Sequence, residues 1–362
     1  MTAIHHFVPT YEPGAVGGHI AELQRLCHEL GWDSEVFTEH RRFDGKPSRD
    51  FRDYPRLARP GDVLVYHVAI GSDVADFVGS RPETLVVDHH NITPAAYFEV
   101  WDPPVAHGVA WGRRQLAELA DRTTLGLADS SFNRSELDDL GYRPTAVAPI
   151  LFDPSELERD VDPAAAERLA ADGTVWLFVS RFAPNKCQHD LVKAFAVYRR
   201  VYEPGAHLRL VGRLPSGPYV DALHRLVADL GLEDAVSFVG AVDDGTLGAH
   251  YRAADVYVTV SEHEGFAVTP LEAMHHGLPV VAFAGGAVPE TLGGAGLCLD
   301  SKEAGTVAAA VHRVVDDADL RASLVAAGRR RLAGFSLEAS RTVMADHLRR
   351  VVAGAGPGAV GP

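Results

Sequence analysis

The sequence predicts an α/β protein made of two doubly wound halves that face each other across a cleft. Short apolar runs alternate with stretches of helical spacing along the chain, a pattern typical of βαβ units and parallel sheets. The length of 362 residues allows two domains, each large enough for its own core. Polar residues follow almost every expected strand, and parallel sheets bind ligands at those strand ends.

The expected strands fall into two groups. In the first half they span 3–8, 33–38, 62–68, 84–90, 124–130 and 145–150. In the second half they span 175–181, 207–212, 236–240, 256–261, 279–284 and 297–300. Intervening stretches such as 189–201 and 218–231 carry apolar residues at helical spacing.

The expected connection between the halves is the polar, proline-punctuated segment 152–173. We therefore place the first domain at 1–155 and the second at 170–335. The glycine-rich tail 354–362 is expected to be disordered.

Composition argues against several classes of function. The net charge of −15 disfavours a nucleic-acid partner, because phosphate binding draws on Lys and Arg. Three widely spaced cysteines predict a reducing compartment rather than a disulfide framework. The first residues lack the pattern of a signal peptide, and no apolar run reaches the length of a membrane span. We expect a cytoplasmic protein without membrane insertion, of undetermined oligomeric state.

Arg181 and Lys186 bracket the loop that follows the strand at 175–181. A cationic pair beside a helix N-terminus suits a diphosphate, whose charge it stabilises. The alternative is a solvated loop with two ordinary surface charges. The carboxylates described next favour the binding site.

Glu264 and Glu272 stand eight residues apart in the stretch SEHEGFAVTPLEAM. Thr269 is the expected helix cap, Pro270 the first helical residue, and Glu272 the partner in a capping box. Glu264 lies before this cap and beside Gly265, where a backbone can approach a ligand closely. Local structure therefore does not account for Glu264.

Gly17 and Gly18 precede an expected amphipathic helix. A glycine pair at a helix start exposes backbone N–H groups to an anion. The sequence is not GxGxxG, so it does not predict a dinucleotide site. A tight turn explains the pair equally well.

His67 and His90 each end an expected strand. A histidine that faces a cleft can hydrogen-bond a sugar or exchange protons near neutral pH. The alternative is a core or loop histidine, which stays open because the chain has 18 histidines. Strand alternation separates His89 from His90 and favours His90. Ser72 and Asn91 follow the same strands and, with His67, are candidate acceptor ligands.

Two further groups of charged residues are interpreted as solvent-exposed charges without a binding role. The pairs Asp160/Asp162 and Asp317/Asp319 have a spacing that some enzymes use for a divalent metal, but neither follows a strand, so we predict no metal. The basic segment 40–60 is expected to be a solvated loop rather than a membrane or anion contact, because no apolar face accompanies its charges.

With a cationic loop, two glutamates at E-x7-E spacing and twin α/β halves, the chain resembles a family-4 retaining glycosyltransferase of GT-B fold, which has two Rossmann-like domains. VSRFAPNK is similar to the family's Arg…Lys loop, and SEHEGFAVTPLEAMHHGLPVVAF to its E-x7-E region. GGAVPETLGGAGL is similar to the segment that usually follows. The first half matches more loosely, through its Gly-Gly loop, strand-end histidine and LADSSFNRSEL.

The resemblance implies a role for each matched residue. Arg181 and Lys186 hold the donor diphosphate, Glu264 contacts hydroxyls of the transferred sugar, and Glu272 binds the ribose. The backbone N–H groups beside the sugar belong to Gly265, Phe266, Ala267 and Val268.

The first domain and the segment 236–242 complete this implied site. His90 lies under the reacting sugar, Gly17 and Gly18 complete the phosphate site, and 236–242 frames the base. A last helix near 336–353 packs back onto the first domain. Cys187 and Ala267 depart from residues that are common in the family, which bears on donor details rather than on the reaction.

The implied activity is transfer of a sugar, with retention, from a UDP- or GDP-sugar to a small soluble acceptor. The implied mechanism is front-face, without metal or cofactor, and the leaving phosphate acts as base. Alternatives of the same fold are a nucleotide-sugar 2-epimerase and a pseudo-glycosyltransferase that couples cyclitols. A non-catalytic nucleotide-sugar binding protein is a further alternative, disfavoured by the complete set of Arg181, Lys186, Glu264 and Glu272.

Overall fold

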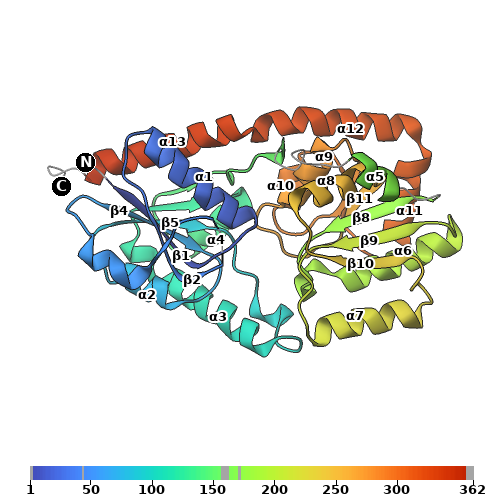
Figure 1. Ribbon diagram of the computed structural model, residues 1–362, viewed down its shortest axis with the longest axis horizontal. Helices are drawn as coiled ribbons and strands as arrows, with labels where there is room; N and C mark the ends of the chain where they lie inside the picture. Colours follow the sequence, from blue (N-terminus) through green and yellow to red (C-terminus); the bar gives the residue numbers. More distant parts are fainter. Residues whose placement is uncertain (1–2, 43–44, 156–162, 170–172, 356–362) are drawn as a thin grey trace. The chain divides into compact units, whose positions relative to one another are not determined.

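The computed structural model describes residues 3–42, 45–155, 163–169 and 173–355. These residues form two compact units, each with its own parallel sheet (Figure 1). The first unit comprises described residues within 1–99, 103–152 and 335–362, and the second those within 100–102 and 153–334. The divisions at 152 and 335 lie close to the predicted domain limits, and residues 100–102 are an unpredicted addition to the second unit.

The sheet of the first unit has the strand order β3-β2-β1-β4-β5-β6-β7, and all its pairings are parallel. Its strands are β1 (Ile4–Tyr11), β2 (Val36–Arg41), β3 (Arg49–Asp50), β4 (Val63–Val68), β5 (Thr84–His89), β6 (Leu125–Ala128) and β7 (Thr145–Val147). The order reverses between β1 and β4, where open parallel sheets hold ligands. The register of β4 and β5 sets His67 beside Asp88.

Helices cover both faces of this sheet (Figure 1). They are α1 (Ala15–Glu29), α2 (Asp73–Gly79), α3 (Pro103–Glu118), α4 (Ser131–Asp139) and α13 (Leu337–Ala355), with short 3-10 turns η1 (Phe51–Arg56), η2 (Ala95–Tyr97) and η3 (Ala120–Arg122). Covered on both faces, the central strands are almost wholly apolar or buried, as expected of a parallel sheet.

The last helix, α13, completes the core of the first unit although it follows the second unit in the chain. Met344 and Leu348 are fully buried and belong to one apolar cluster with Leu23 of α1 and Val65 of β4. Arg341 adds ion pairs from α13 to two glutamates of α1, Glu22 and Glu29.

The sheet of the second unit has the order β10-β9-β8-β11-β12-β13, again with parallel pairings. Its strands are β8 (Val175–Val179), β9 (His207–Val211), β10 (Val236–Gly240), β11 (Val256–Thr259), β12 (Val280–Phe283) and β13 (Leu297–Leu299). The order reverses between β8 and β11, so the loops after these two strands lie at the switch point of the sheet.

The helices of the second unit lie on both faces of its sheet. They are α5 (Pro163–Leu169), α6 (Gln188–Val201), α7 (Pro218–Asp229), α8 (Asp244–Arg252), α9 (Val268–His275), α10 (Val288–Leu292), α11 (Ala304–Asp316) and α12 (Ala318–Leu332), with 3-10 turns η5 (Pro184–Lys186) and η6 (Ala333–Phe335). The largest side chain of the core is Trp176 of β8, which packs edge-on against Phe195 and Tyr198 of α6. Among the described residues, no helix has both the length and the apolar character to cross a membrane.

Every predicted strand is present, but two expectations about connecting segments are wrong. The segment 40–60 is not simply a solvated loop, because β2 runs to Arg41 and β3 and η1 follow, with Phe51 and Tyr54 buried. Charged residues alternate with these aromatic residues in the sequence, so the pattern did not indicate a buried apolar face. The prediction of a disordered tail at 354–362 is wrong for residues 354–355, which belong to α13, and residues 356–362 lie outside the described part.

The packing of α13 predicts a large effect of Leu348→Ala. Its buried side chain leaves a cavity on truncation, so the free energy of unfolding should fall by about 2–5 kcal/mol. Val343 lies on the same helix but is 36% exposed, so Val343→Ala should change the free energy of unfolding by less than about 1 kcal/mol. Urea unfolding measures both. Equal losses in the two variants would contradict the burial of this helix face.

Candidate functional site

The loop after β8 carries the predicted cationic residues. Arg181 is exposed two residues after the end of β8, while Phe182 and Ala183 are buried and η5 follows. Cys187 adopts a left-handed conformation (φ 54°) at the junction of η5 and α6, which ends the turn and begins the helix. Lys186 therefore leaves the chain immediately before the N-terminus of α6.

Lys186 meets Glu264 of the loop after β11. Lys186 Nζ donates to Glu264 Oε1 at 2.6 Å, and the two side chains are 16% and 17% exposed. Half-burial makes this pair stronger than a fully solvated one, yet leaves both groups accessible. The structure thus brings together two of the predicted site residues, which are 78 positions apart.

Asn185 connects the same two loops through its backbone carbonyl and its side-chain amide. Glu262 N–H donates to the Asn185 carbonyl at 2.9 Å, and Asn185 Nδ2 donates to the His263 carbonyl at 3.3 Å. Asn185 is 1% exposed, so these bonds are shielded from water. They position Lys186 and Glu264, which are adjacent to them in sequence.

A third loop, after β12, hydrogen-bonds the backbone of Glu264. Ala287 N–H donates to the Glu264 carbonyl at 2.8 Å. Gly286 has φ of +57°, and a Cβ atom there would lie 2.3 Å from the Glu264 carbonyl oxygen. Only glycine permits this close approach.

The segment from Gly265 to Val268 leads into α9. Phe266 and Ala267 are buried, and Ala267 (φ 69°) is the residue that precedes the helix. No side chain caps the helix at this residue. The first N–H groups of a helix have no intrahelical partner, so an uncapped N-terminus suits an anionic ligand.

The predicted capping box at this helix is wrong. Thr269 lies inside α9, and its hydroxyl hydrogen-bonds Tyr257 Oη at 2.6 Å. Glu272 does not reach back to the cap; its Oε2 accepts from Tyr251 Oη at 2.6 Å. Two buried tyrosines from α8 and β11 therefore replace the local capping contacts.

Burial raises the pKa of Glu272 to about 7, although the hydrogen bond from Tyr251 works in the opposite direction. Near neutral pH, Glu272 thus changes between a carboxylic acid, which can donate a hydrogen bond, and a carboxylate, which only accepts them.

Lys302 is a site residue that the sequence reasoning missed. It follows β13 and forms ion pairs with Asp190 of α6, at 2.6 Å, and with Glu262. It thereby joins the start of α6 to the loop that carries Glu264. Lys302 is one of only four lysines and stands at a strand end, which is the signal that would have identified it.

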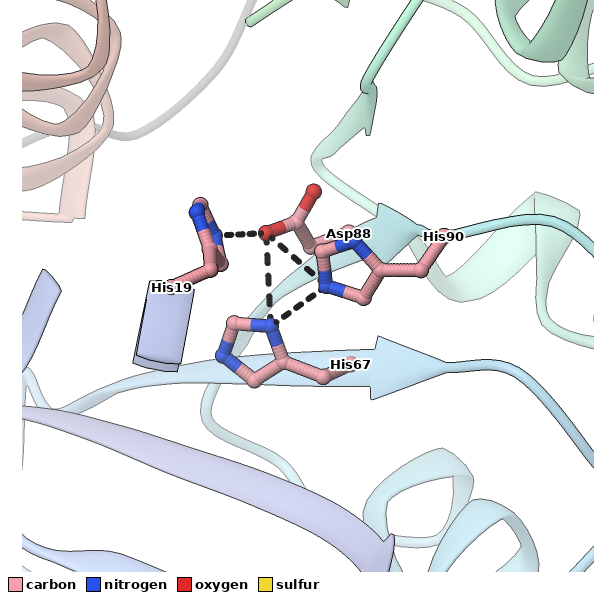
Figure 2. Close-up of side chains that lie close together, drawn as sticks. All are labelled: His19, His67, Asp88 and His90. Atoms are coloured by element: carbon pink, nitrogen blue, oxygen red, sulfur yellow. Dashed lines mark hydrogen bonds and ion pairs between the residues drawn. The ribbon is translucent and has the colours of Figure 1, made fainter. Parts of the chain in front are cut away.

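In the first unit, the predicted residues His67 and His90 lie in one cluster with His19 and Asp88 (Figure 2). All four residues are buried. His67 of β4 and His90, directly after β5, have ring nitrogens 3.0 Å apart. Both face Asp88 Oδ2, as does His19 of α1 at 3.0 Å. His90 Nδ1 lies 3.0 Å from Asp129.

These contacts bear on three expectations. The imidazole of His90 is enclosed and both its nitrogens have protein partners, and its expected place under the reacting sugar stays a prediction. Burial lowers the pKa of His90, but Asp129 and Asp88 outweigh this effect and raise it to about 9. His67 is fully buried and Ser72 is 4% exposed with its hydroxyl bonded to Tyr66, so neither fits an acceptor ligand.

The remaining first-unit candidates are less constrained. Asn91 is part-buried with φ of 78°, and its Nδ2 donates to Asn133. Gly17 and Gly18 lie inside α1, whose preceding residue is Gly14, and Gly18 N–H already donates to the Gly14 carbonyl. Gly18 is therefore not the free anion donor that was expected.

Two clusters in the described part of the chain have the ligand types and spacing to hold a metal ion. One is the buried group of His19, His67, Asp88 and His90, and the other comprises Cys187, His189 and Asp190. Of the acidic pairs, Asp160/Asp162 lies outside the described residues. Asp317 caps α12 by accepting from Leu320 N–H, in agreement with its reading as a surface residue.

Known proteins that are similar to this chain are described as glycosyltransferases. Residues 164–331 match the family described as Glycosyl transferases group 1. A D-inositol 3-phosphate glycosyltransferase of Kineococcus radiotolerans is 34% identical over 96% of this chain and 94% of its own length.

Other relatives align over a shorter part. A protein of the same description from Geodermatophilus obscurus is 36% identical over 68% of this chain, which spans 56% of that relative's length. A GDP-mannose-dependent alpha-(1-6)-phosphatidylinositol monomannoside mannosyltransferase of Mycobacterium tuberculosis is 34% identical over 62% of each chain. Among solved structures, sucrose-phosphate synthase from Thermosynechococcus elongatus has a TM-score of 0.77 at 22% identity, covering 97% of this chain and 99% of its own. This likeness confirms the predicted fold, two Rossmann-like units of GT-B type.

The raised pKa of Glu272 predicts a pH-dependent stability. A carboxyl whose pKa rises on folding stabilises the protein below its unfolded pKa of 4.5, and this stability is lost as the pH rises through about 7. Glu272→Gln should remove this dependence. The difference in unfolding free energy, variant minus wild type, should therefore be about 1–3 kcal/mol larger at pH 8 than at pH 5. Denaturant titrations at both pH values measure this difference, with the exposed Glu233→Gln as control. Parallel pH profiles of wild type and Glu272→Gln would contradict the shift.

Gly286→Ala should destabilise the second unit. The added methyl group collides with the Glu264 carbonyl and requires a strained positive φ, at a cost of about 1–3 kcal/mol. Gly305, exposed in the first turn of α11 with no atom near a Cβ, is the control, and Gly305→Ala should be neutral or stabilising. Thermal or urea unfolding distinguishes the two. A neutral Gly286→Ala would show that the loops do not approach this closely.

Proposed function

Because the chain belongs to the group 1 glycosyltransferases, we propose that it moves a sugar from a nucleotide-diphosphate donor, a UDP- or GDP-sugar, to a small soluble acceptor. Family membership rests on the relative that is 34% identical and almost fully covered. The observation that carries the proposal is the half-buried contact of Lys186 with Glu264 at the strand ends of the second unit.

Lys186 and Arg181 bind the donor diphosphate in this proposal. The phosphate oxygens compete with Glu264 for the Lys186 ammonium, which lies beside the N-terminus of α6. The uncapped start of α9 adds backbone N–H groups from Gly265 to Val268. These donors stabilise the charge that develops on the leaving group.

Glu264 and Glu272 then bind hydroxyl groups of the donor. Once phosphate engages Lys186, the Glu264 carboxylate is available to accept hydrogen bonds from the transferred sugar. Glu272, held by Tyr251, accepts from the ribose in its ionised form. Its pKa near 7 makes donor binding stronger as the pH rises through neutrality.

The transfer itself proceeds on one face of the sugar, with retention of configuration. The bond to the diphosphate breaks as the acceptor oxygen forms the new bond, and the leaving phosphate takes the acceptor proton. No carboxylate acts as a covalent nucleophile, and we propose that this step uses neither a metal nor a cofactor. A reducing, cytoplasmic setting suits the three free thiols.

The acceptor is proposed to be small and polar. The Kineococcus radiotolerans relative is named for D-inositol 3-phosphate, which is of this class. His67, Ser72 and the imidazole of His90 do not form the acceptor pocket, because they are buried. Asn91 remains the candidate from the first unit.

The test combines donor identification with substitution of Lys186. A thermal-shift panel of UDP-, GDP- and dTDP-sugars should show one base that raises the melting temperature. With that donor, Lys186→Ala should lower the rate of nucleotide release by about 10²–10³-fold, since it removes a cation from the leaving group. Lys193→Ala, on the exposed side of α6, should retain the wild-type rate.

Product analysis completes this test. A glycosylated acceptor that retains the donor's anomeric configuration supports the proposal, whereas an isomerised sugar, nucleotide-linked or free, with no glycosylated product identifies an epimerase. A Lys186→Ala variant with full activity would overturn the assignment of the donor site.

A further inference from the structure

The buried cluster of the first unit consists of His19, His67, Asp88 and His90. We propose that His67 Nδ1, Asp88 Oδ2 and His90 Nε2 bind a divalent transition-metal ion of the zinc class, with His19 and Asp129 orienting these ligands. This inference does not rest on the proposed function, and the ion takes no part in the proposed sugar transfer. It replaces the expectation from sequence that the chain binds no metal.

The distances among the three ligand atoms fit a single small ion. His67 Nδ1 lies 3.0 Å from His90 Nε2 and 3.3 Å from Asp88 Oδ2, and His90 Nε2 lies 3.6 Å from Asp88 Oδ2. A tetrahedral ion with bonds of about 2.0–2.1 Å separates its ligand atoms by about 3.3 Å. The observed separations fall on both sides of this value.

The way in which the side chains converge also favours an ion over hydrogen bonds alone. Three imidazoles approach the same oxygen of Asp88, while Asp88 Oδ1 is buried with no hydrogen-bond partner among the described residues (Figure 2). A hydrogen-bonded network would be more stable with its donors divided between both oxygens. His67 and His90 can both present lone pairs, rather than N–H groups, on the side of this oxygen, as expected where ligands converge on a cation.

The positions of the ring protons select the ligands. Leu151 N–H donates to His19 Nδ1 at 2.9 Å, so neutral His19 carries its proton on Nε2 and donates it to Asp88. His19 therefore orients Asp88 and is not a ligand itself. His90 Nδ1 faces Asp129, which places the His90 proton there and leaves Nε2 free to coordinate.

His67 follows the same rule. Its Nε2 lies 3.1 Å from His6 Nδ1, so Nε2–H can donate to His6 and Nδ1 is left to coordinate. Each ligating imidazole thus has a partner on its other nitrogen, the usual arrangement around protein-bound zinc. An open fourth position would accept a water molecule.

Charge balance gives an independent argument. Asp88 is fully buried and Asp129 is 3% exposed. Two carboxylates removed from water require compensating positive charge. A protonated His90 would compensate only one of these charges, whereas one divalent ion with neutral imidazoles compensates both and leaves the cluster neutral.

Metal analysis of the untagged full-length chain tests the proposal. After incubation with Zn²⁺ and exhaustive dialysis, elemental analysis should find about one equivalent per chain. Asp88→Asn and His67→Gln should lower this content at least tenfold. His89→Gln is the matched control, because His89 is equally buried beside the ligands but contacts Glu136 instead.

Three further measurements keep the test valid if a ligand variant misfolds. Co²⁺ bound to the wild-type chain should give the visible absorption of a four-coordinate site. Asp129→Asn, which keeps all three ligands, should weaken Zn²⁺ affinity about 10–100-fold without abolishing binding. Adding zinc to chelator-treated wild type should raise its melting temperature.

Two outcomes would overturn the proposal. In one, the folded wild-type chain retains less than about a tenth of an equivalent of any first-row metal after loading. In the other, bound metal survives Asp88→Asn but is lost in Cys187→Ser, which would place the ion at the Cys187, His189 and Asp190 group.

Discussion

The loops at the carboxyl edge of the second sheet must satisfy their backbone groups against one another, and the rest of the site depends on this constraint. Asn185 bonds two residues of the neighbouring loop, and the Glu264 carbonyl accepts from Ala287 of a third loop. These bonds leave little freedom for Lys186 and Glu264, whose side chains meet as a consequence. Preorganisation of this kind lets a site stabilise charge without reorganising during the reaction.

The position of this edge could be predicted because parallel strands end together. The expectation that Lys186 and Glu264 converge needs only their placement after strands, and the structure brings them into contact. Lys302 and Asp190 could not be paired in the same way, since 112 residues separate them and no local pattern links them. Glu272 shows the opposite case, in which a plausible local contact was outcompeted by a buried tyrosine.

The histidines show how far strand alternation can be used. It correctly separates His89, which contacts Glu136, from His90, which contacts Asp129. It does not say how deep a side chain lies, and His67 and His90 proved to be buried rather than open to a ligand. The cluster and its partners His6 and Asp129 come from α1, β1, β4, β5 and the loops after β5 and β6, so only the folded unit reveals it.

The first unit is built from separate parts of the chain, and this sets the order in which its parts are synthesised. Its sheet and α1 leave the ribosome first, but α13, which covers the apolar cluster around Leu23 and Val65, is translated only after the whole second unit. Until then the nascent first unit exposes an apolar face. Its final consolidation is therefore coupled to translation of α13.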